Sequence, residues 1–234
     1  MEKKRLFAWA VKQSIPVMLG YIFLGIAYGI VQQEAGLGVA WALLISGLVY
    51  AGSMQFALVP LLTAGTPLPV IALMTLMVNC RHLFYGLSFV DTFREMGKKY
   101  PYMIFSLTDE TYSLLVSCKD DSMMQERNHL ACFYISALDQ FYWVLGSVIG
   151  ALAGSMLTFD TTGIDFAMTA LFVVILVDQL RSGRRAWACA ALGLALGVVF
   201  LLLVGADDFL LPTLLCTMVG LAAMDRYHVR KEAA

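Results

Sequence analysis

Long apolar blocks limit what this chain can fold into. Seven such blocks, each of roughly 20 residues, alternate with short polar stretches, and a helix needs about 20 apolar residues to cross a bilayer core. Hydrophobic residues make up 60% and charged residues 14% of the sequence, against about 45–50% and about 25% in soluble domains. We therefore predict an all-α, polytopic transmembrane bundle of about seven spans, forming one integral membrane domain over residues 1–234. The blocks cover residues 14–31, 40–62, 67–90, 131–153, 164–180, 186–204 and 208–224.

Composition and motifs exclude several classes of function. The formal net charge is −1, and no basic run interleaved with aromatic residues indicates a nucleic-acid surface. The five cysteines stand singly, without the spacing of a zinc or redox site, so we expect buried hydrophobic side chains and no metal. The motifs of zinc proteases, serine hydrolases and P-loop ATPases are absent from the sequence. We expect neither an enzyme nor a bound cofactor.

Basic residues predict the orientation of the spans. Lys and Arg cluster before the first block and over residues 94–127, 181–185 and 226–231. The positive-inside rule places these segments, and with them both termini, in the cytoplasm. Three simple crossings from a cytoplasmic N-terminus would nevertheless leave residue 91 outside.

Two arrangements would correct this count of crossings. Either the segment Gly52–Gln55 is broken and re-entrant, or residues 102–118 cross as an eighth span with Asp109 and Glu110 inside the bundle. Both place irregular backbone at membrane depth, where only protein or a water-filled cavity can satisfy its polar groups. Either arrangement therefore predicts a solute pathway.

A weak internal similarity predicts a repeat. Tyr21-x-x-Leu24-Gly25-x-x-x-Gly29 resembles Tyr142-x-x-Leu145-Gly146-x-x-x-Gly150, and residues 55–57 resemble residues 165–167. Transporters often place the substrate where two such repeats meet. The similarity leaves open whether the repeat is parallel or inverted. The glycines at every fourth position also favour close helix packing.

The most informative polar segment is Asn79–Gly86, which puts charge inside an apolar block. An intramembrane charge is costly unless it is paired or hydrated. Arg81 could hold a substrate carboxylate through two hydrogen bonds, with Asn79 and Tyr85 nearby, or it could neutralise an acidic residue. His82 could relay a proton at physiological pH, or it could form a hydrogen bond between helices.

Acidic residues form a second candidate site. Asp109 and Glu110 are adjacent, so on a helix their side chains diverge by about 100° and cannot face the same point. We predict that one is a counter-charge and the other a proton carrier or gate, with solvated loop acids as the alternative. Asp139 and Asp178 lie near block ends, where we expect interfacial snorkelling.

The segment Gly52–Phe56 is a third candidate, inside the second apolar block and followed by Pro60. Ser53 and Gln55 could receive the ammonium end of an amino acid, as polar groups do in broken transporter helices. A simple kink packed on a neighbouring helix is the alternative.

Together these segments resemble the AzlC family, the large subunits of branched-chain amino acid exporters. The resemblance implies export of valine, leucine, isoleucine or methionine, driven by the proton motive force, from the cytoplasmic membrane of a prokaryote. It also implies a small AzlD-like membrane subunit as partner. The motifs that carry the resemblance are Gly52-Ser53-Met54-Gln55-Phe56, Asn79-x-Arg81-His82-x-x-Tyr85-Gly86, Thr108-Asp109-Glu110-Thr111 and Gly163-Ile164-Asp165-Phe166-Ala167.

Three other functions compete with the transporter hypothesis. A channel for small amphipathic solutes would need no energy coupling, and its flux would follow the substrate gradient alone. An integral membrane enzyme would use His82, Asp109 and Glu110 as acid and base groups on a lipid-soluble substrate. A structural subunit would need Arg81 and Asp109 for assembly only.

Overall fold

The computed structural model is mainly helical and has no strand in the residues that it describes, which are 2–119, 121–156, 173, 176–177, 180–181, 184–205 and 209–232. The chain forms two compact units, Met1–Thr161 and Thr162–Ala234. The predicted all-α membrane bundle is confirmed. The block predicted at 164–180 lies almost wholly outside the described residues, as do Asp178 and the motif at 163–167.

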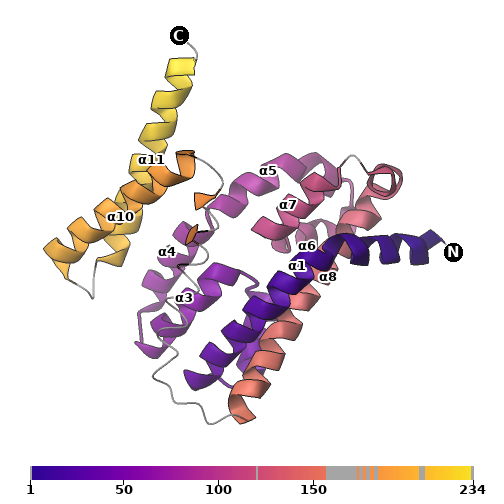
Figure 1. Cartoon of the computed structure of the whole chain (residues 1–234), viewed down its shortest axis with the longest axis horizontal. Helices are drawn as coiled ribbons and strands as arrows, with labels where there is room; N and C mark the ends of the chain where they lie inside the picture. Colours follow the sequence, from indigo (N-terminus) through magenta and orange to yellow (C-terminus); the bar gives the residue numbers. More distant parts are fainter. Residues whose placement is uncertain are drawn as a thin grey trace. The chain divides into compact units, whose positions relative to one another are not determined.

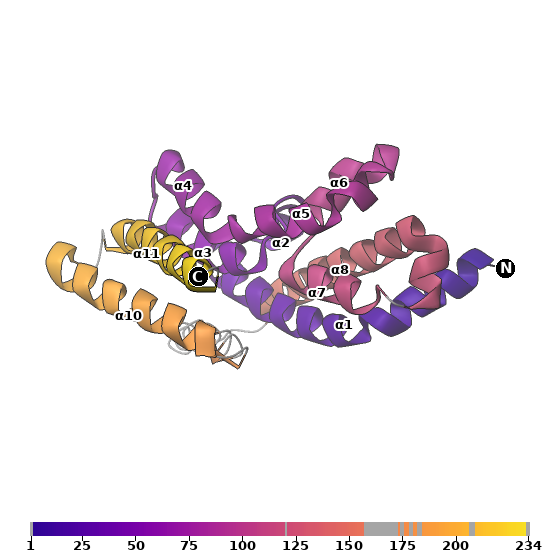
Figure 2. The ribbon, with the colours of Figure 1, turned by 90° about the horizontal axis from the view of Figure 1, so that it is seen from above.

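Two long helices, α1 (Glu2–Glu34) and α8 (Ser122–Met156), form the frame of the first unit and lie side by side (Figures 1 and 2). They run in the same direction, because Gly25 faces Gly146 and residues further along each helix face each other in turn. A methyl group added at Gly146 would lie 2.7 Å from the Ile22 carbonyl oxygen. Glycine here allows the two backbones to touch.

The two glycine motifs of the predicted repeat are the surfaces that pack together. A methyl group on Gly25 would lie 3.0 Å from the Trp143 carbonyl oxygen, and one on Gly29 would lie 2.6 Å from the Ala151 nitrogen. The two copies of the glycine motif therefore pack against each other in parallel, which is the arrangement that a parallel repeat would require.

The block predicted at 40–62 is broken into α2 (Val39–Leu48) and α3 (Gly52–Thr63). Tyr50, between these helices, has a φ of 42°, a backbone conformation that an α-helix does not contain and that non-glycine residues rarely adopt. The predicted break near Gly52 is confirmed.

α2 and α3 form a hairpin, the first hairpin, along the long helices. The end of α1 lies beside Gly154 of α8. At the other end of α2, the Gln140 amide of α8 donates a hydrogen bond to the Gly47 carbonyl at 3.0 Å. α3 then turns back, since the Phe56 ring lies 5.4 Å from the Tyr28 ring, one to two turns before the end of α1. The tip of the first hairpin therefore lies beside the middle of α8.

The block predicted at 67–90 is also interrupted, which the sequence did not predict. α4 (Leu68–Asn79) ends before Cys80, and α5 (Arg81–Arg94) begins after it. At about 1.5 Å per residue, neither helix alone spans a 30 Å bilayer core.

Of the two alternative arrangements, the structure does not show the eighth span over residues 102–118. The stretch contains α6 (Tyr100–Phe105), preceded by the 3-10 turn η1 (Gly97–Lys99), and α7 (Asp109–Ser117), separated by Ser106–Thr108. Both helices are too short to cross a membrane. Thr108 ends the irregular segment because its side chain caps the first turn of α7.

α6 and α7 form a second hairpin. It starts near the N-terminal part of α8, where Lys99 lies over the Phe133 ring. Its tip lies near the first hairpin, with the Phe105 ring 6.1 Å from the Tyr50 ring. α7 then returns to an apolar cluster near the start of α1. This cluster contains Leu6, Ala10, Phe93, Met96, Met103, Leu107, Leu115, Cys118, Met124, Ala131, Cys132 and Ile135.

Three described helices are long and apolar enough to cross a membrane: Lys3–Glu34, His129–Met156 and Ala186–Val204. The other apolar helices in the described residues are shorter, so the predicted bundle, about seven spans with a possible re-entrant segment, combines long helices with broken ones. In the second unit, α10 (Arg184–Val204) packs against α11 (Leu210–Glu232). Two glycines of α10 are part of this contact, since a methyl group on either Gly193 or Gly197 would lie 3.9 Å from a threonine methyl of α11.

Candidate functional site

The tips of the two hairpins meet beside the α1–α8 pair. Tyr50, at the first tip, lies 6.1 Å from the Phe105 ring at the second tip and 6.5 Å from the Tyr21 ring of α1. Tyr50 is buried, although it occupies irregular backbone. Two interruptions of helical structure thus share one buried region, as the solute-pathway hypothesis requires.

Gln55 holds the first tip in place. Its side-chain oxygen accepts hydrogen bonds from the Ala51 backbone N–H at 3.1 Å and from the Trp143 indole at 2.9 Å. Its nitrogen donates to the Ser46 hydroxyl at 3.2 Å. The completely buried amide therefore joins α2, the break, α3 and α8, and it satisfies a backbone donor that the break releases.

Aromatic side chains surround the two tips. Trp143 lies 5.5 Å from Tyr21 and is stacked on Tyr28 at 6.1 Å, and Phe56 makes an edge contact with Tyr28 at 5.4 Å. These rings come from α1, α3 and α8. They form an apolar wall with a few polar atoms, which is the usual composition of a small-molecule site.

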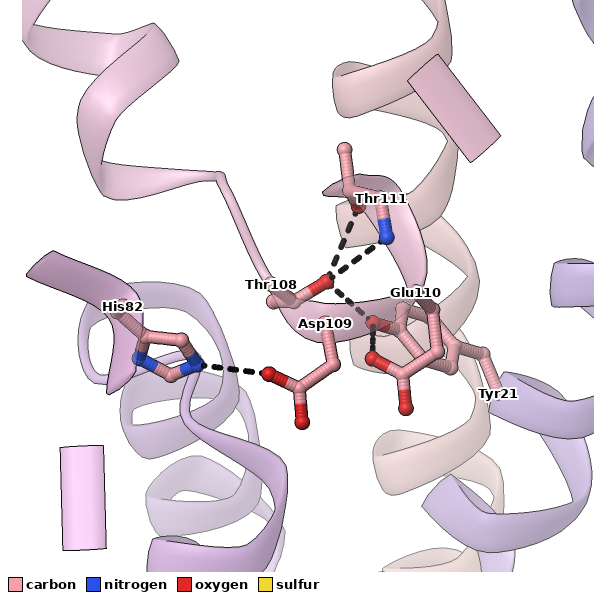
Figure 3. A network of polar contacts seen from close by, with 6 residues as sticks. All are labelled: Tyr21, His82, Thr108, Asp109, Glu110 and Thr111. Atoms are coloured by element: carbon pink, nitrogen blue, oxygen red, sulfur yellow. Dashed lines mark hydrogen bonds and ion pairs between the residues drawn. The ribbon is translucent and has the colours of Figure 1, made fainter. Parts of the chain in front are cut away.

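The adjacent acids at the start of α7 face different partners, as the helical spacing predicted. Asp109 Oδ1 lies 3.5 Å from His82 Nε2 of α5, and Glu110 Oε2 lies 2.8 Å from the Tyr21 hydroxyl (Figure 3). Asp109 is half-buried and Glu110 is exposed. One turn of helix thus connects two separate polar contacts, one with α5 and one with α1.

A row of hydroxyl groups continues from Glu110 into the protein. Tyr21 Oη lies 2.6 Å from Thr108 Oγ1, which lies 3.1 Å from Thr111 Oγ1 (Figure 3). Thr111 Oγ1 in turn lies 2.8 Å from Asp139 Oδ2 of α8. The row therefore links an exposed acid to a buried one.

Asp139 corrects the expectation of a snorkelling interfacial acid. Its side chain is completely buried, with Thr111 bonded to one carboxyl oxygen, while Oδ1 has no hydrogen-bond partner among the described residues. The sequence interpretation failed because α8 begins at Ser122, before the apolar block, which places Asp139 near the middle of the helix.

The other predicted site residues have different surroundings. Tyr85 is stacked on Tyr112 at 4.8 Å and lies 5.9 Å from His82, so these rings gather beside Asp109. Ser53, in the first turn of α3, and Asn79, the last residue of α4, are half-buried. The side chain of Arg81 lies outside the described residues.

Sequence reasoning missed the residues that join the predicted ones. Tyr21 and Trp143 lie between the two tips, and Thr111 connects the acids of α7 to α8. The sequence carried one signal for this region, since Tyr21 opens the first copy of the predicted repeat and Trp143 lies in the second. No group of His, Cys, Asp and Glu within the described part of the chain could hold a metal ion.

Fold and site together define a helical membrane protein whose broken helices meet in an aromatic, partly polar interior. Residues 16–157, which include both hairpins, match the family described as "AzlC protein". The chain belongs to the AzlC family, a family of transport proteins.

Two relatives illustrate the extent of the similarity. The chain is 38% identical over 221 residues to the "Branched-chain amino acid transport protein AzlC" of Bacillus subtilis, covering 92% of this chain and 85% of that protein. It is 28% identical to the "Inner membrane protein YgaZ" of Escherichia coli, covering 83% and 82% of the two chains. No solved structure matches the chain.

Proposed function

We propose that the protein exports branched-chain amino acids, namely valine, leucine and isoleucine, and also methionine, across the cytoplasmic membrane. The observation that carries the proposal is the meeting of two broken hairpins around Tyr21 and Tyr50, in a chain 38% identical to a named branched-chain amino acid transport protein. Broken helices place polar backbone groups at membrane depth, where transporters bind their substrates. We further propose that the whole chain acts as one transporter domain with both termini in the cytoplasm.

The proposed substrate site combines an apolar wall with polar ends. Trp143, Tyr28 and Phe56 suit a branched aliphatic side chain, which needs contact area and no hydrogen bonds. Ser53, in the first turn of α3, would bind the ammonium end of the amino acid, because its hydroxyl oxygen can accept a hydrogen bond. Gln55 would act mainly by fixing the tip that presents this turn.

Arg81, Asn79 and Tyr85 are proposed to complete substrate binding at the start of α5. Arginine is suited to the substrate carboxylate because its planar guanidinium can donate two parallel hydrogen bonds. Their position at the junction between α4 and α5, close to the His82–Asp109 contact, supports this role.

Proton coupling is proposed to use His82, Asp109 and Glu110. His82 and Asp109 form a contact that strengthens when the histidine is protonated, and Glu110 faces a separate hydroxyl network. A channel would need no such arrangement of titratable groups, so the geometry favours a coupled transporter. The named relative is a transport protein, which also favours transport over enzymatic turnover.

Efflux from cells tests the proposed function. Cells expressing the chain with an AzlD-like partner should lose preloaded labelled leucine, valine and methionine faster than cells lacking either protein, and an uncoupler should stop this efflux. Arg81→Ala should abolish efflux at a normal membrane level of protein, whereas Arg94→Ala, at the other end of α5, should not. Unchanged efflux in Arg81→Ala would remove that residue from the site, and no amino acid efflux with both proteins well expressed would contradict the proposal.

A further inference from the structure

We infer that Asp139 is a buried proton-binding site, connected to the surface by a hydroxyl relay that runs through Thr111, Thr108 and Tyr21 to Glu110. The relay crosses three helices, because Tyr21 belongs to α1, Glu110 and Thr111 to α7, and Asp139 to α8. In the transporter, Asp139 would be the group that carries the proton. This transport role rests on the proposed function.

If each contact of the relay is a hydrogen bond, the relay needs one proton more than its hydroxyls supply. Five oxygen atoms are joined by four contacts of 2.8, 2.6, 3.1 and 2.8 Å, from Glu110 through Tyr21, Thr108 and Thr111 to Asp139. If both acids are ionised, the three hydroxyls supply only three hydrogens for these four contacts. The fourth contact needs one more hydrogen, which one of the two carboxyl groups must carry.

The extra proton can occupy either end of the relay. With Glu110 protonated, every hydroxyl donates toward Asp139, and with Asp139 protonated, every hydroxyl donates toward Glu110. Conversion moves one hydrogen along each contact, so Glu110 loses one proton, Asp139 gains one, and the three hydroxyls are regenerated. No other reactant is needed, since the hydroxyls only turn and pass hydrogen on.

The two ends of the relay differ in their surroundings. Glu110 is exposed, whereas Asp139 is completely buried and its Oδ1 has no partner among the described residues. A buried carboxylate is costly without a cation or several donors. No described Lys or Arg forms an ion pair with Asp139.

The titratable groups around Asp139 are all acidic. Within the described residues, Tyr50 of the first tip, Tyr102 of α6 and Glu110 of α7 interact electrostatically with Asp139, and Tyr21 of α1 is linked to it through the relay. Neutral tyrosines cannot balance a negative charge on Asp139. A proton is therefore the simplest positive charge that this position can accept, and Glu110 is the group that can deliver it.

A purely structural role would require the same contacts but no movement of the proton, and infrared spectroscopy separates the two roles. We expect the reconstituted wild-type protein, without substrate or partner, to show a carboxylic acid band that changes with pH. Asp139→Asn should remove this band, and Asp91→Asn, which changes an exposed acid of α5, should leave it unchanged. A band that persists in Asp139→Asn would overturn the inference.

A second variant keeps Asp139 and breaks its connection. In Thr111→Val the band should remain, but its exchange with deuterium should be slower than in the wild type, because the relay has lost a hydroxyl. Thr63→Val is the matched control, since the Thr63 hydroxyl bonds only carbonyls of its own helix. Equal exchange rates in Thr111→Val and Thr63→Val would also overturn the relay.

The transport arm separates this inference from the proposed function. Asp139→Asn should still exchange labelled for unlabelled leucine, while its uncoupler-sensitive efflux should fall by about 100-fold, the scale of a lost proton-transfer group. Absence of leucine exchange in the wild type would contradict the proposed function and leave the infrared result to decide on Asp139. Wild-type efflux in Asp139→Asn would contradict the proton-binding role alone.

Discussion

Gln55 and its neighbours show how single side chains can keep irregular backbone stable in an apolar interior. The Ala51 N–H and the Trp143 indole N–H would both be unsatisfied without the Gln55 oxygen that accepts from them. A buried donor without a partner costs about 1–3 kcal/mol, so this one amide matters for the whole first hairpin.

Replacing Gln55 tests this role. Gln55→Leu should lower the free energy of unfolding by about 2 kcal/mol, because two buried donors lose their acceptor while the side-chain volume is kept. Thermal unfolding of the purified protein in detergent would measure the change. Gln13→Leu on α1 is the control, and equal stability of the two variants would show that Gln55 does not hold the tip.

Residue-level prediction from sequence was uneven for a physical reason. The divergence of Asp109 and Glu110 follows from helix geometry alone, so it could be predicted before their partners were known. Asp139 could not be placed, because its burial depends on where α8 begins and on the return of α7, neither of which is encoded next to it.

The central element of the first unit is the parallel pair of α1 and α8. Gly29 meets the backbone of α8 directly, whereas Gly20, on the same helix, has nothing within 4 Å of an added methyl group. Close backbone contact replaces the hydrophobic effect as the source of helix association in lipid.

A pair of alanine substitutions tests the packing of these two helices. Gly29→Ala should destabilise the protein by about 1–3 kcal/mol, since an extra methyl group overpacks the contact. Gly20→Ala should be neutral or stabilise by up to about 1 kcal/mol, because alanine is the better helix former. The comparison uses thermal unfolding in detergent, and a Gly29→Ala variant as stable as Gly20→Ala would contradict the contact.

Element boundaries were predictable where helices are continuous and not where they break. The apolar composition of residues 40–62 and 67–90 is the same whether a helix continues or stops, so hydropathy found the blocks but missed the break at Cys80. The break near Gly52 was predicted because glycine and a mid-membrane glutamine mark it.

At the scale of the whole molecule, the hairpins resolve the count of crossings. The first hairpin enters and leaves on the same side, so it contributes no net crossing. α4 and α5 together then return the chain to the side where α1 began, because the end of α5 packs in the same apolar cluster as the start of α1. α8 can then run in the same direction as α1. The positive-inside rule predicts that the starts of both helices lie in the cytoplasm, an orientation that labelling can test.

Cysteine labelling tests this topology. In a cysteine-free background, Glu34→Cys and Met156→Cys, at the ends of α1 and α8, should react with an impermeant thiol reagent from the same, outer side. Lys4→Cys and Lys119→Cys should react only after the membrane is permeabilised. Labelling of residues 34 and 156 from opposite sides would contradict the parallel arrangement.

The measurement that tests the central claim most directly is proton movement driven by leucine. Vesicles containing the chain and an AzlD-like partner are loaded with leucine, diluted into leucine-free buffer, and followed with an internal pH dye. Export coupled to proton entry predicts that the interior acidifies as leucine leaves, and that vesicles loaded with glutamate show no change. Leucine efflux without any change in internal pH would contradict proton coupling and leave a channel as the better description.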